Sequence, residues 1–221
     1  MKIHRPPHAC PRDIGVSLGC ARQCSLPASS PVIRVLVVDD HPAVRAGLLA
    51  ILRAEPGLVP VGAASTADEA VEQAERGGCT VALVDYHLRE EDGLTLCRAL
   101  KALAQPPRVL IYSSFVTPAL AMPASLAGAD GLVDKGTPTD ELLESIRAVS
   151  RGRTAMPDVG PELMQAAATR LDTEDLPILG MTLEGTPPAE IADVLRVTEQ
   201  DIEARLTAML SRLRVPTSPA G

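Results

Sequence analysis

Acidic side chains follow two apolar runs at the point where each run ends. Val35-Leu36-Val37-Val38 is followed at once by Asp39 and Asp40, and the run 81–84 is followed by Asp85. A short apolar run bounded by polar residues is typical of a strand buried on both faces of a parallel sheet. Because ligands gather at the carboxyl ends of such strands, we expect the three carboxylates to form one site. Their mutual repulsion calls for a cation, and an all-oxygen, hydrated site suits Mg2+.

A serine and a lysine end two further apolar runs. Ser113 closes the run 109–112, and Lys135 follows Gly131-Leu132-Val133-Asp134. A lysine is a compact positive charge that can hold a phosphate, and a serine hydroxyl can donate to a phosphoryl oxygen. With Asp85 as nucleophile, this set has every part that phosphoryl transfer needs. The alternative is that the acids only cap the helices that follow them, a role that does not require Lys135.

Strands and helices alternate regularly over residues 32–151. The apolar periodicity predicts strands at 32–38, 58–63, 80–85, 108–113 and 131–134. It predicts helices at 42–54, 67–76, 93–103, 118–128 and 138–151. Five βα units in sequence indicate an α/β domain with a five-stranded parallel, doubly wound (flavodoxin-like) sheet.

The flanks of this domain have a different character. Residues 1–31 are rich in proline with little apolar periodicity and are predicted to be a disordered tail, as are residues 216–221. Glycine and proline in 152–161 indicate a linker. Residues 162–215 show only short helical patterns, which predicts a small all-α second domain.

The composition excludes several classes of protein. The chain has 221 residues, 46% of them hydrophobic, with no Trp, two Tyr and one Phe, so base stacking on aromatic platforms is not expected. No run approaches the roughly 20 apolar residues of a membrane span, which favours a cytoplasmic protein without a membrane partner. Five scattered cysteines without a CxxC pair fit neither a disulfide framework nor a zinc site.

Four segments together resemble a known family. VLVVDDH, the D-x-x-L-x-x-x-D-G run from Asp85 to Gly93, YSS and GADGLVDK are similar to the receiver domain of bacterial two-component response regulators. The resemblance implies phosphotransfer from a histidine kinase to Asp85. It also implies a Mg2+ site formed by Asp39, Asp40, Asp85 and the backbone carbonyl of His87. It further implies that Ser113 and Lys135 form a switch pair that senses the phosphoryl group.

Two other interpretations of the acid site were weighed against this one. His41 follows the acid pair, but imidazole adds nothing that carboxylate and metal chemistry lacks, so we interpret it as a surface residue beside the cluster. Aspartyl-phosphate phosphatases also use an aspartate nucleophile with Mg2+. They need an acid-base carboxylate close after the nucleophile, where this chain has His87. We therefore expect a regulator and not an enzyme.

Residues 184–213 have the spacing of a helix-turn-helix. One helix is predicted to start at Thr186-Pro187, and Thr198 with Asp201 forms an acidic variant of the capping box for the next. Pro177 falls inside the preceding helical pattern, where an interior proline costs about 3 kcal/mol. The order EGxxxxEIAxxLxVxExxI resembles the C-terminal domain of NarL/LuxR-type regulators, which implies DNA binding by the helix that begins near Thr198.

The charge of this domain leaves two hypotheses open. Candidate DNA contacts are Gln200, Arg205 and Arg212, which would pair with adenine or form a basic stripe. Residues 160–221, however, carry five arginines against ten acids. The first hypothesis is a phosphorylation-controlled transcription regulator, with a possible homodimer on phosphorylation. The second is a signalling adaptor whose acidic output domain binds protein instead of DNA.

Overall fold

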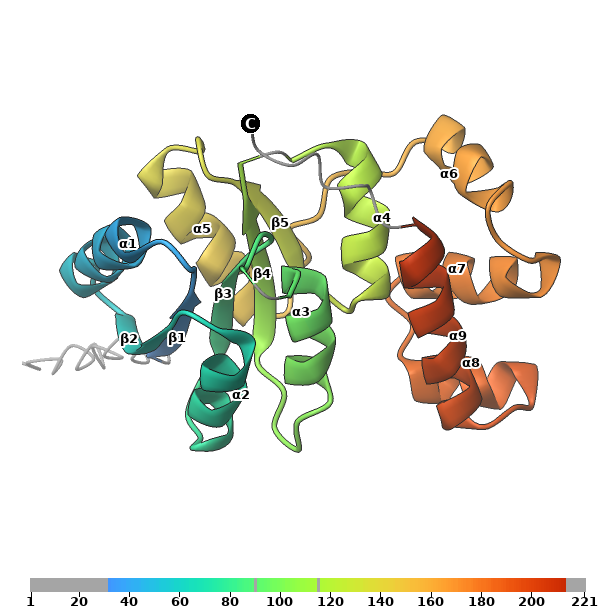
Figure 1. Cartoon of the computed structure of the whole chain (residues 1–221), viewed down its shortest axis with the longest axis horizontal. Coiled ribbons are helices and arrows are strands. Elements are labelled where there is room, and N and C mark those ends of the chain that lie inside the picture. Colours follow the sequence, from blue (N-terminus) through green and yellow to red (C-terminus); the bar gives the residue numbers. More distant parts are fainter. Residues whose placement is uncertain (1–31, 90, 115, 214–221) are drawn as a thin grey trace, which may run out of the picture. The chain divides into compact units, whose positions relative to one another are not determined.

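A computed structural model describes residues 32–89, 91–114 and 116–213. In the first part, strands and helices alternate as expected, each within two residues of its predicted ends (Figure 1). The elements are β1 (Ile33–Val38), α1 (Pro42–Ala54), β2 (Leu58–Ala64), α2 (Ala67–Glu75), β3 (Val81–Asp85), α3 (Gly93–Lys101), β4 (Arg108–Ser113), α4 (Pro118–Leu126), β5 (Gly131–Asp134) and α5 (Thr139–Ser150). The predicted tails 1–31 and 216–221 lie outside the described residues.

The five strands form one sheet in the order β2-β1-β3-β4-β5, and every pairing is parallel. The prediction of a doubly wound parallel sheet is therefore confirmed. The register sets which residues meet at its carboxyl edge. Val38 pairs with Val84, so Asp39 and Asp85 follow side by side, and Ser113 pairs with Asp134, directly before Lys135.

The sheet is buried on both faces, which explains its continuous apolar runs. Val35 and Val37 belong to a core formed with α1 and α5. Leu36 and Val38, which alternate with them, belong to a core formed with α2, α3 and α4. Because both faces are covered by apolar contacts, the polar residues Asp39, Asp85 and Ser113 lie at the carboxyl ends of the inner strands.

The second part is entirely helical, as predicted. Its elements are α6 (Pro161–Ala168), a short 3-10 helix η1 (Thr173–Asp175), α7 (Leu176–Leu183), α8 (Pro188–Leu195) and α9 (Glu199–Leu213). Arg196 ends α8 in the left-handed conformation with φ of 57°. The predicted capping box starts α9: the Thr198 amide donates to Asp201 Oδ2, and the Asp201 amide donates to Thr198 Oγ1, both at 3.1 Å.

Two expectations about prolines were wrong. Pro177 does not interrupt a helix, because α7 begins at Leu176 and the proline lies in its first turn, where no intrahelical N–H is needed. The residues before it form η1 instead of the start of the same helix. The next helix begins at Pro188, with Pro187 as its N-cap, one residue later than predicted.

Helix α4 has no charged residue, a property that it shares with α7. Its residues from Leu120 to Ala124 are all buried, and the helix contacts β5 as well as α7 and α9. A helix that is apolar on all sides is buried on all sides. An ion pair of 2.6 Å between Arg98 on α3 and Glu203 on α9 lies in the same region. None of the helices described has the length and apolar character to cross a bilayer.

Candidate functional site

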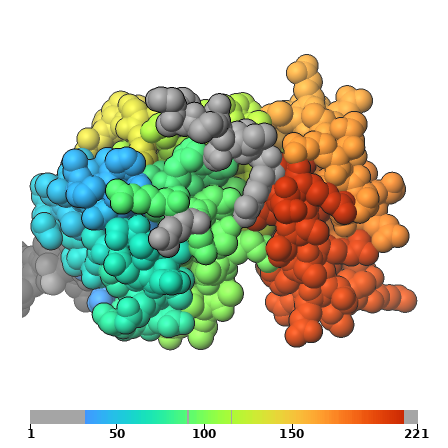
Figure 2. Space-filling view, in the orientation of Figure 1, coloured from blue at the N-terminus to red at the C-terminus, as the bar shows by residue number. Residues whose placement is uncertain are grey.

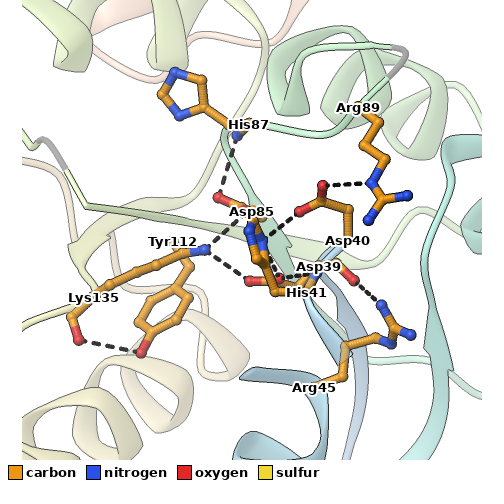
Figure 3. A network of polar contacts seen from close by, with 9 residues as sticks. All are labelled: Asp39, Asp40, His41, Arg45, Asp85, His87, Arg89, Tyr112 and Lys135. Atoms are coloured by element: carbon orange, nitrogen blue, oxygen red, sulfur yellow. Dashed lines mark hydrogen bonds and ion pairs between the residues drawn. The ribbon is translucent and has the colours of Figure 1, made fainter. Parts of the chain in front are cut away.

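Two buried carboxylates and one amine form the centre of the carboxyl edge. The side chains of Asp39 and Asp85 are only 1% and 3% exposed. Lys135 Nζ lies 2.7 Å from Asp39 Oδ2 and 2.8 Å from Asp85 Oδ2 (Figure 3). The structure therefore brings together the predicted acceptor Asp85, the predicted phosphate-binding Lys135 and Asp39, which the sequence assigned to the metal site. A helix-capping role for the acids does not account for this arrangement, since neither Asp39 nor Asp85 is the N-cap of a described helix.

Asp40 completes the acidic cluster. Its Oδ2 lies 3.3 Å from Nε of Arg89, whereas its Oδ1 is buried and accepts no hydrogen bond from the described residues. One possible ligand atom from each of Asp39, Asp40, His41 and Asp85 lies within 4.8 Å of the others. Carboxylate donors with one buried oxygen free fit a hard divalent cation such as Mg2+. The oxygens Oδ2 of Asp39 and Asp85 face Lys135, so the remaining oxygens are the ones that could hold the ion.

Burial and neighbouring charges act in opposite directions on these groups. Burial raises the pKa of Asp85, the nearby Asp39 charge adds to the rise, and Lys135 opposes it. For Lys135, burial would lower the pKa, but hydrogen bonds and charge attraction from Asp39 and Asp85 outweigh it and raise the pKa. Lys135 is therefore a fixed positive charge at neutral pH. Asp85 is a carboxylate of increased basicity, as a nucleophile requires.

The loop after β3 approaches the site closely. The His87 amide donates to Asp85 Oδ1 at 3.2 Å, which fixes the carboxylate, and the Gly93 amide donates to the Tyr86 carbonyl at 2.8 Å. Asp92 accepts from the Thr95 amide at 2.8 Å and starts α3. Gly93 ends the D-x-x-L-x-x-x-D-G run of the sequence, and its surroundings explain why a glycine is needed there. A Cβ on Gly93 would lie 2.2 Å from the Asp85 carbonyl oxygen.

Replacing Gly93 with alanine is expected to destabilise the protein by about 1–3 kcal/mol, because backbone must move to admit the methyl group. Gly47→Ala is the control. No atom lies within 4 Å of a Cβ at Gly47 in α1, so this change is expected to stabilise by up to about 1 kcal/mol. Urea denaturation followed by circular dichroism measures both. Equal stability of the two variants would contradict the close-approach argument.

Several residues at the site were not predicted from the sequence. Arg45 Nη1 donates to the Asp39 carbonyl oxygen at 2.6 Å. The Tyr112 ring lies 5.5 Å from Lys135 Nζ, and burial raises the pKa of its phenol. Arg89 holds Asp40, as described above. Arg45 lies on α1 directly after the acid pair, so helical spacing could have indicated it, whereas no sequence signal places Arg89 beside Asp40.

Ser113 and His41 lie where the sequence placed them. Ser113 is fully buried at the carboxyl end of β4, next to Asp134 of β5. His41 is exposed, as predicted for a surface residue, but its Nδ1 lies 2.6 Å from Asp40 Oδ1 and 3.5 Å from Asp39 Oδ1. The imidazole therefore faces the acid cluster.

Comparison with known proteins agrees with this geometry. Residues 35–147 match the family model described as the response regulator receiver domain. The chain is a response regulator. Its relatives include the DNA-binding transcriptional activator DevR/DosR of Mycobacterium tuberculosis, with 30% identity over 82% of this chain and 88% of the relative. Another is the transcriptional regulatory protein LiaR of Bacillus subtilis, with 30% identity over 83% of this chain and 92% of the relative.

A solved structure gives the same result for the fold. The two-component response regulator of the LuxR family from Aurantimonas sp. SI85-9A1 is 31% identical, with a TM-score of 0.56, and covers 63% of this chain and 99% of its own. The response regulator described here thus combines a receiver domain with a C-terminal region of the NarL/LuxR type. This membership agrees with the prediction of a regulator rather than an enzyme.

In the C-terminal region of the response regulator, two arginines of α9 form ion pairs with acids that lie just before α7. Arg205 on α9 lies 2.9 Å from Glu174 and 3.2 Å from Asp175. Arg212 lies 2.7 Å from Asp172 and 3.6 Å from Asp175. Part of α9 forms the molecular surface in Figure 2. Gln200, near the start of α9, is exposed. Of the three candidate DNA contacts, Gln200 makes no side-chain hydrogen bond to a described residue, and both arginines are paired with acids.

Proposed function

We propose that this response regulator accepts a phosphoryl group on Asp85 from a histidine kinase and regulates transcription through its C-terminal helices. The contact of Lys135 with both Asp39 and Asp85 carries the proposal, because an amine held between two buried acids is placed to follow a charge that arrives on one of them. A cytoplasmic location and a homodimer on phosphorylation belong to the same proposal.

The reaction follows from the residues present. An oxygen of Asp85 forms a bond to phosphorus while the bond from phosphorus to the donor's leaving group breaks, and the leaving group takes the bonding electrons. A Mg2+ ion held by Asp39, Asp40, Asp85 and the backbone carbonyl of His87 would neutralise charge on the phosphoryl oxygens. Lys135 exchanges its contact with Asp85 for a phosphoryl oxygen. Ser113 donates its hydroxyl to another, which draws β4 and the start of α4 toward the modified residue.

Acetyl phosphate with Mg2+ is expected to convert the wild-type protein to a form retarded in Phos-tag electrophoresis. Asp85→Ala should show no such form, because the acceptor oxygen is absent. Asp134→Ala is the matched control, since Asp134 ends β5 of the same sheet, accepts a hydrogen bond from the Gly136 amide at 2.7 Å and has no part in the reaction. Modification of Asp85→Ala to the wild-type extent would overturn the assignment of the acceptor.

A second function is favoured by one specific observation. Because Arg205 and Arg212 are both paired with acids of the same domain, the C-terminal helices offer little free positive charge to a phosphate backbone. An adaptor that binds protein through these helices is consistent with that. Binding of the phosphorylated protein to DNA, measured over a range of salt concentrations, separates the two: a steep fall in affinity with salt supports transcription, and no binding at low salt supports the adaptor.

A further inference from the structure

The carboxylate of Asp40 is oriented by two basic side chains. Arg89 approaches Oδ2, and His41 approaches Oδ1 with its Nδ1 at 2.6 Å. The side chain of Asp40 is 11% exposed, and Oδ1 itself is buried. No described residue gives Oδ1 a hydrogen bond, and this includes His41 despite the short distance. The imidazole nitrogen and the buried carboxylate oxygen are therefore close neighbours within the acid cluster.

This arrangement is typical of two donors beside a common ion. Ligands of one metal ion lie at short distances from one another because all of them are bound to the same centre. For an octahedral ion with bonds of about 2.1 Å, neighbouring donors lie about 3 Å apart and opposite donors about 4.2 Å apart. His41 Nδ1 lies 2.6 Å from Asp40 Oδ1 and 3.5 Å from Asp39 Oδ1. The ligand atoms of all four residues, Asp85 included, lie within 4.8 Å of one another, about 0.6 Å beyond the separation of opposite donors in that octahedron, so small side-chain movements would bring them to one ion.

We propose that His41 is a nitrogen ligand of the divalent ion, so that the site prefers Mn2+ and related transition ions to Mg2+. The inference rests on the proposed function, which places a divalent ion at Asp85. Imidazole is a good ligand for first-row transition ions, whereas Mg2+ favours oxygen donors and retains its waters. A site with three carboxylates and one imidazole therefore favours transition ions over Mg2+ more strongly than a site with oxygen ligands alone.

The backbone supports this assignment. The His41 amide donates to Asp39 Oδ1 at 2.8 Å, and the His41 carbonyl accepts from the Arg45 amide at 3.1 Å in the first turn of α1. The residue is thus fixed at its main chain on both sides while its ring remains accessible to solvent. Because the main chain of His41 is already fixed, only the rotamers of its side chain must be ordered when an ion binds, which keeps the entropy cost small.

The test is metal binding to the full-length protein by isothermal titration calorimetry with Mg2+ and with Mn2+. We expect His41→Phe, which keeps a ring but no donor, to weaken Mn2+ binding by roughly tenfold or more, the scale on which single partners of a metal site act. Mg2+ binding should change less than twofold. Electron spin-echo modulation should show a nitrogen coupled to Mn2+ in the wild type and not in His41→Phe.

Arg89→Gln is the matched comparison. It removes a positive charge from the other oxygen of Asp40, so both ions should bind more tightly by a similar factor. An unchanged ratio of Mn2+ to Mg2+ affinity in His41→Phe, without nitrogen coupling in the wild type, would overturn the role of His41 and leave phosphorylation of Asp85 intact. Failure of the wild type to bind either ion would overturn the divalent site itself, and with it the metal part of the proposed function.

Discussion

Replacing Lys135 with methionine is expected to lower the free energy of unfolding by about 3 kcal/mol at pH 7.5 in the presence of EDTA, because two buried carboxylates lose their shared counter-ion. The methionine keeps most of the volume of the lysine stem, so the change acts on charge. The raised pKa of Lys135 means that its contribution is fully present below the usual lysine pKa and is lost only as the pH rises above it. The full loss is therefore measured at pH 7.5.

The loss should depend on both pH and metal. As the pH falls toward the raised pKa of Asp85, this carboxylate becomes protonated, its repulsion with the neighbouring acid falls, and the difference between variant and wild type should shrink. Addition of Mg2+ at pH 7.5 should restore a larger part of the stability in Lys135→Met than in the wild type, because the ion replaces the missing charge. Urea denaturation with and without Mg2+ measures both effects.

Lys101→Met is the matched control. Lys101 also makes a 2.6 Å ion pair, with Asp130, but that carboxylate keeps Arg108 at 2.8 Å and the Val109 amide at 2.7 Å. Its loss should be about 1 kcal/mol or less and independent of Mg2+. If Lys135→Met loses no more stability than Lys101→Met, the charge balance derived for the acid site is wrong.

Most of the receiver fold could be predicted because its signals are local and mutually consistent. Short apolar runs define the strands; Asp85 is the last residue of β3, and Asp39 and Lys135 directly follow β1 and β5. Parallel pairing then forces strand-end residues to one edge, so the convergence at the site followed from topology without any knowledge of side-chain contacts.

The details that were missed depend on side-chain direction and on chain geometry over a few residues. Pro177 would break a helix that began one turn earlier, but it lies in the first turn of a helix that begins at Leu176. The periodicity of apolar residues does not locate a helix boundary to within one turn. The contact of Arg89 with Asp40 depends on the path of the loop after β3. The orientation of His41 toward the acid cluster depends on its rotamer, which the sequence does not encode in any pattern.

Neutralising Asp172 and Glu174 is expected to strengthen DNA binding by the C-terminal helices on the order of tenfold at low salt, because Arg212 and Arg205 each lose the nearer of their two acidic partners and keep only Asp175. In the structure these two acids lie 2.7 Å and 2.9 Å from the two arginines. Asp172→Asn with Glu174→Gln changes the net charge of residues 160–221 from -5 to -3. Both acids are exposed, so the fold should be retained.

The slope of log affinity against log salt distinguishes arginine release from a general change in charge. Each additional phosphate contact steepens that slope by about 0.9. Glu162→Gln with Glu184→Gln is the control, since these exposed acids give the same change in net charge and form no ion pair with a residue in the described ranges. Fluorescence anisotropy with a labelled DNA duplex measures the affinity of all three proteins.

A steeper slope only in the Asp172 and Glu174 variant means that the acids of η1 and its N-cap hold the DNA-binding arginines. Equal slopes in both double variants mean that Arg205 and Arg212 do not contact DNA, and the adaptor function then describes this output domain better.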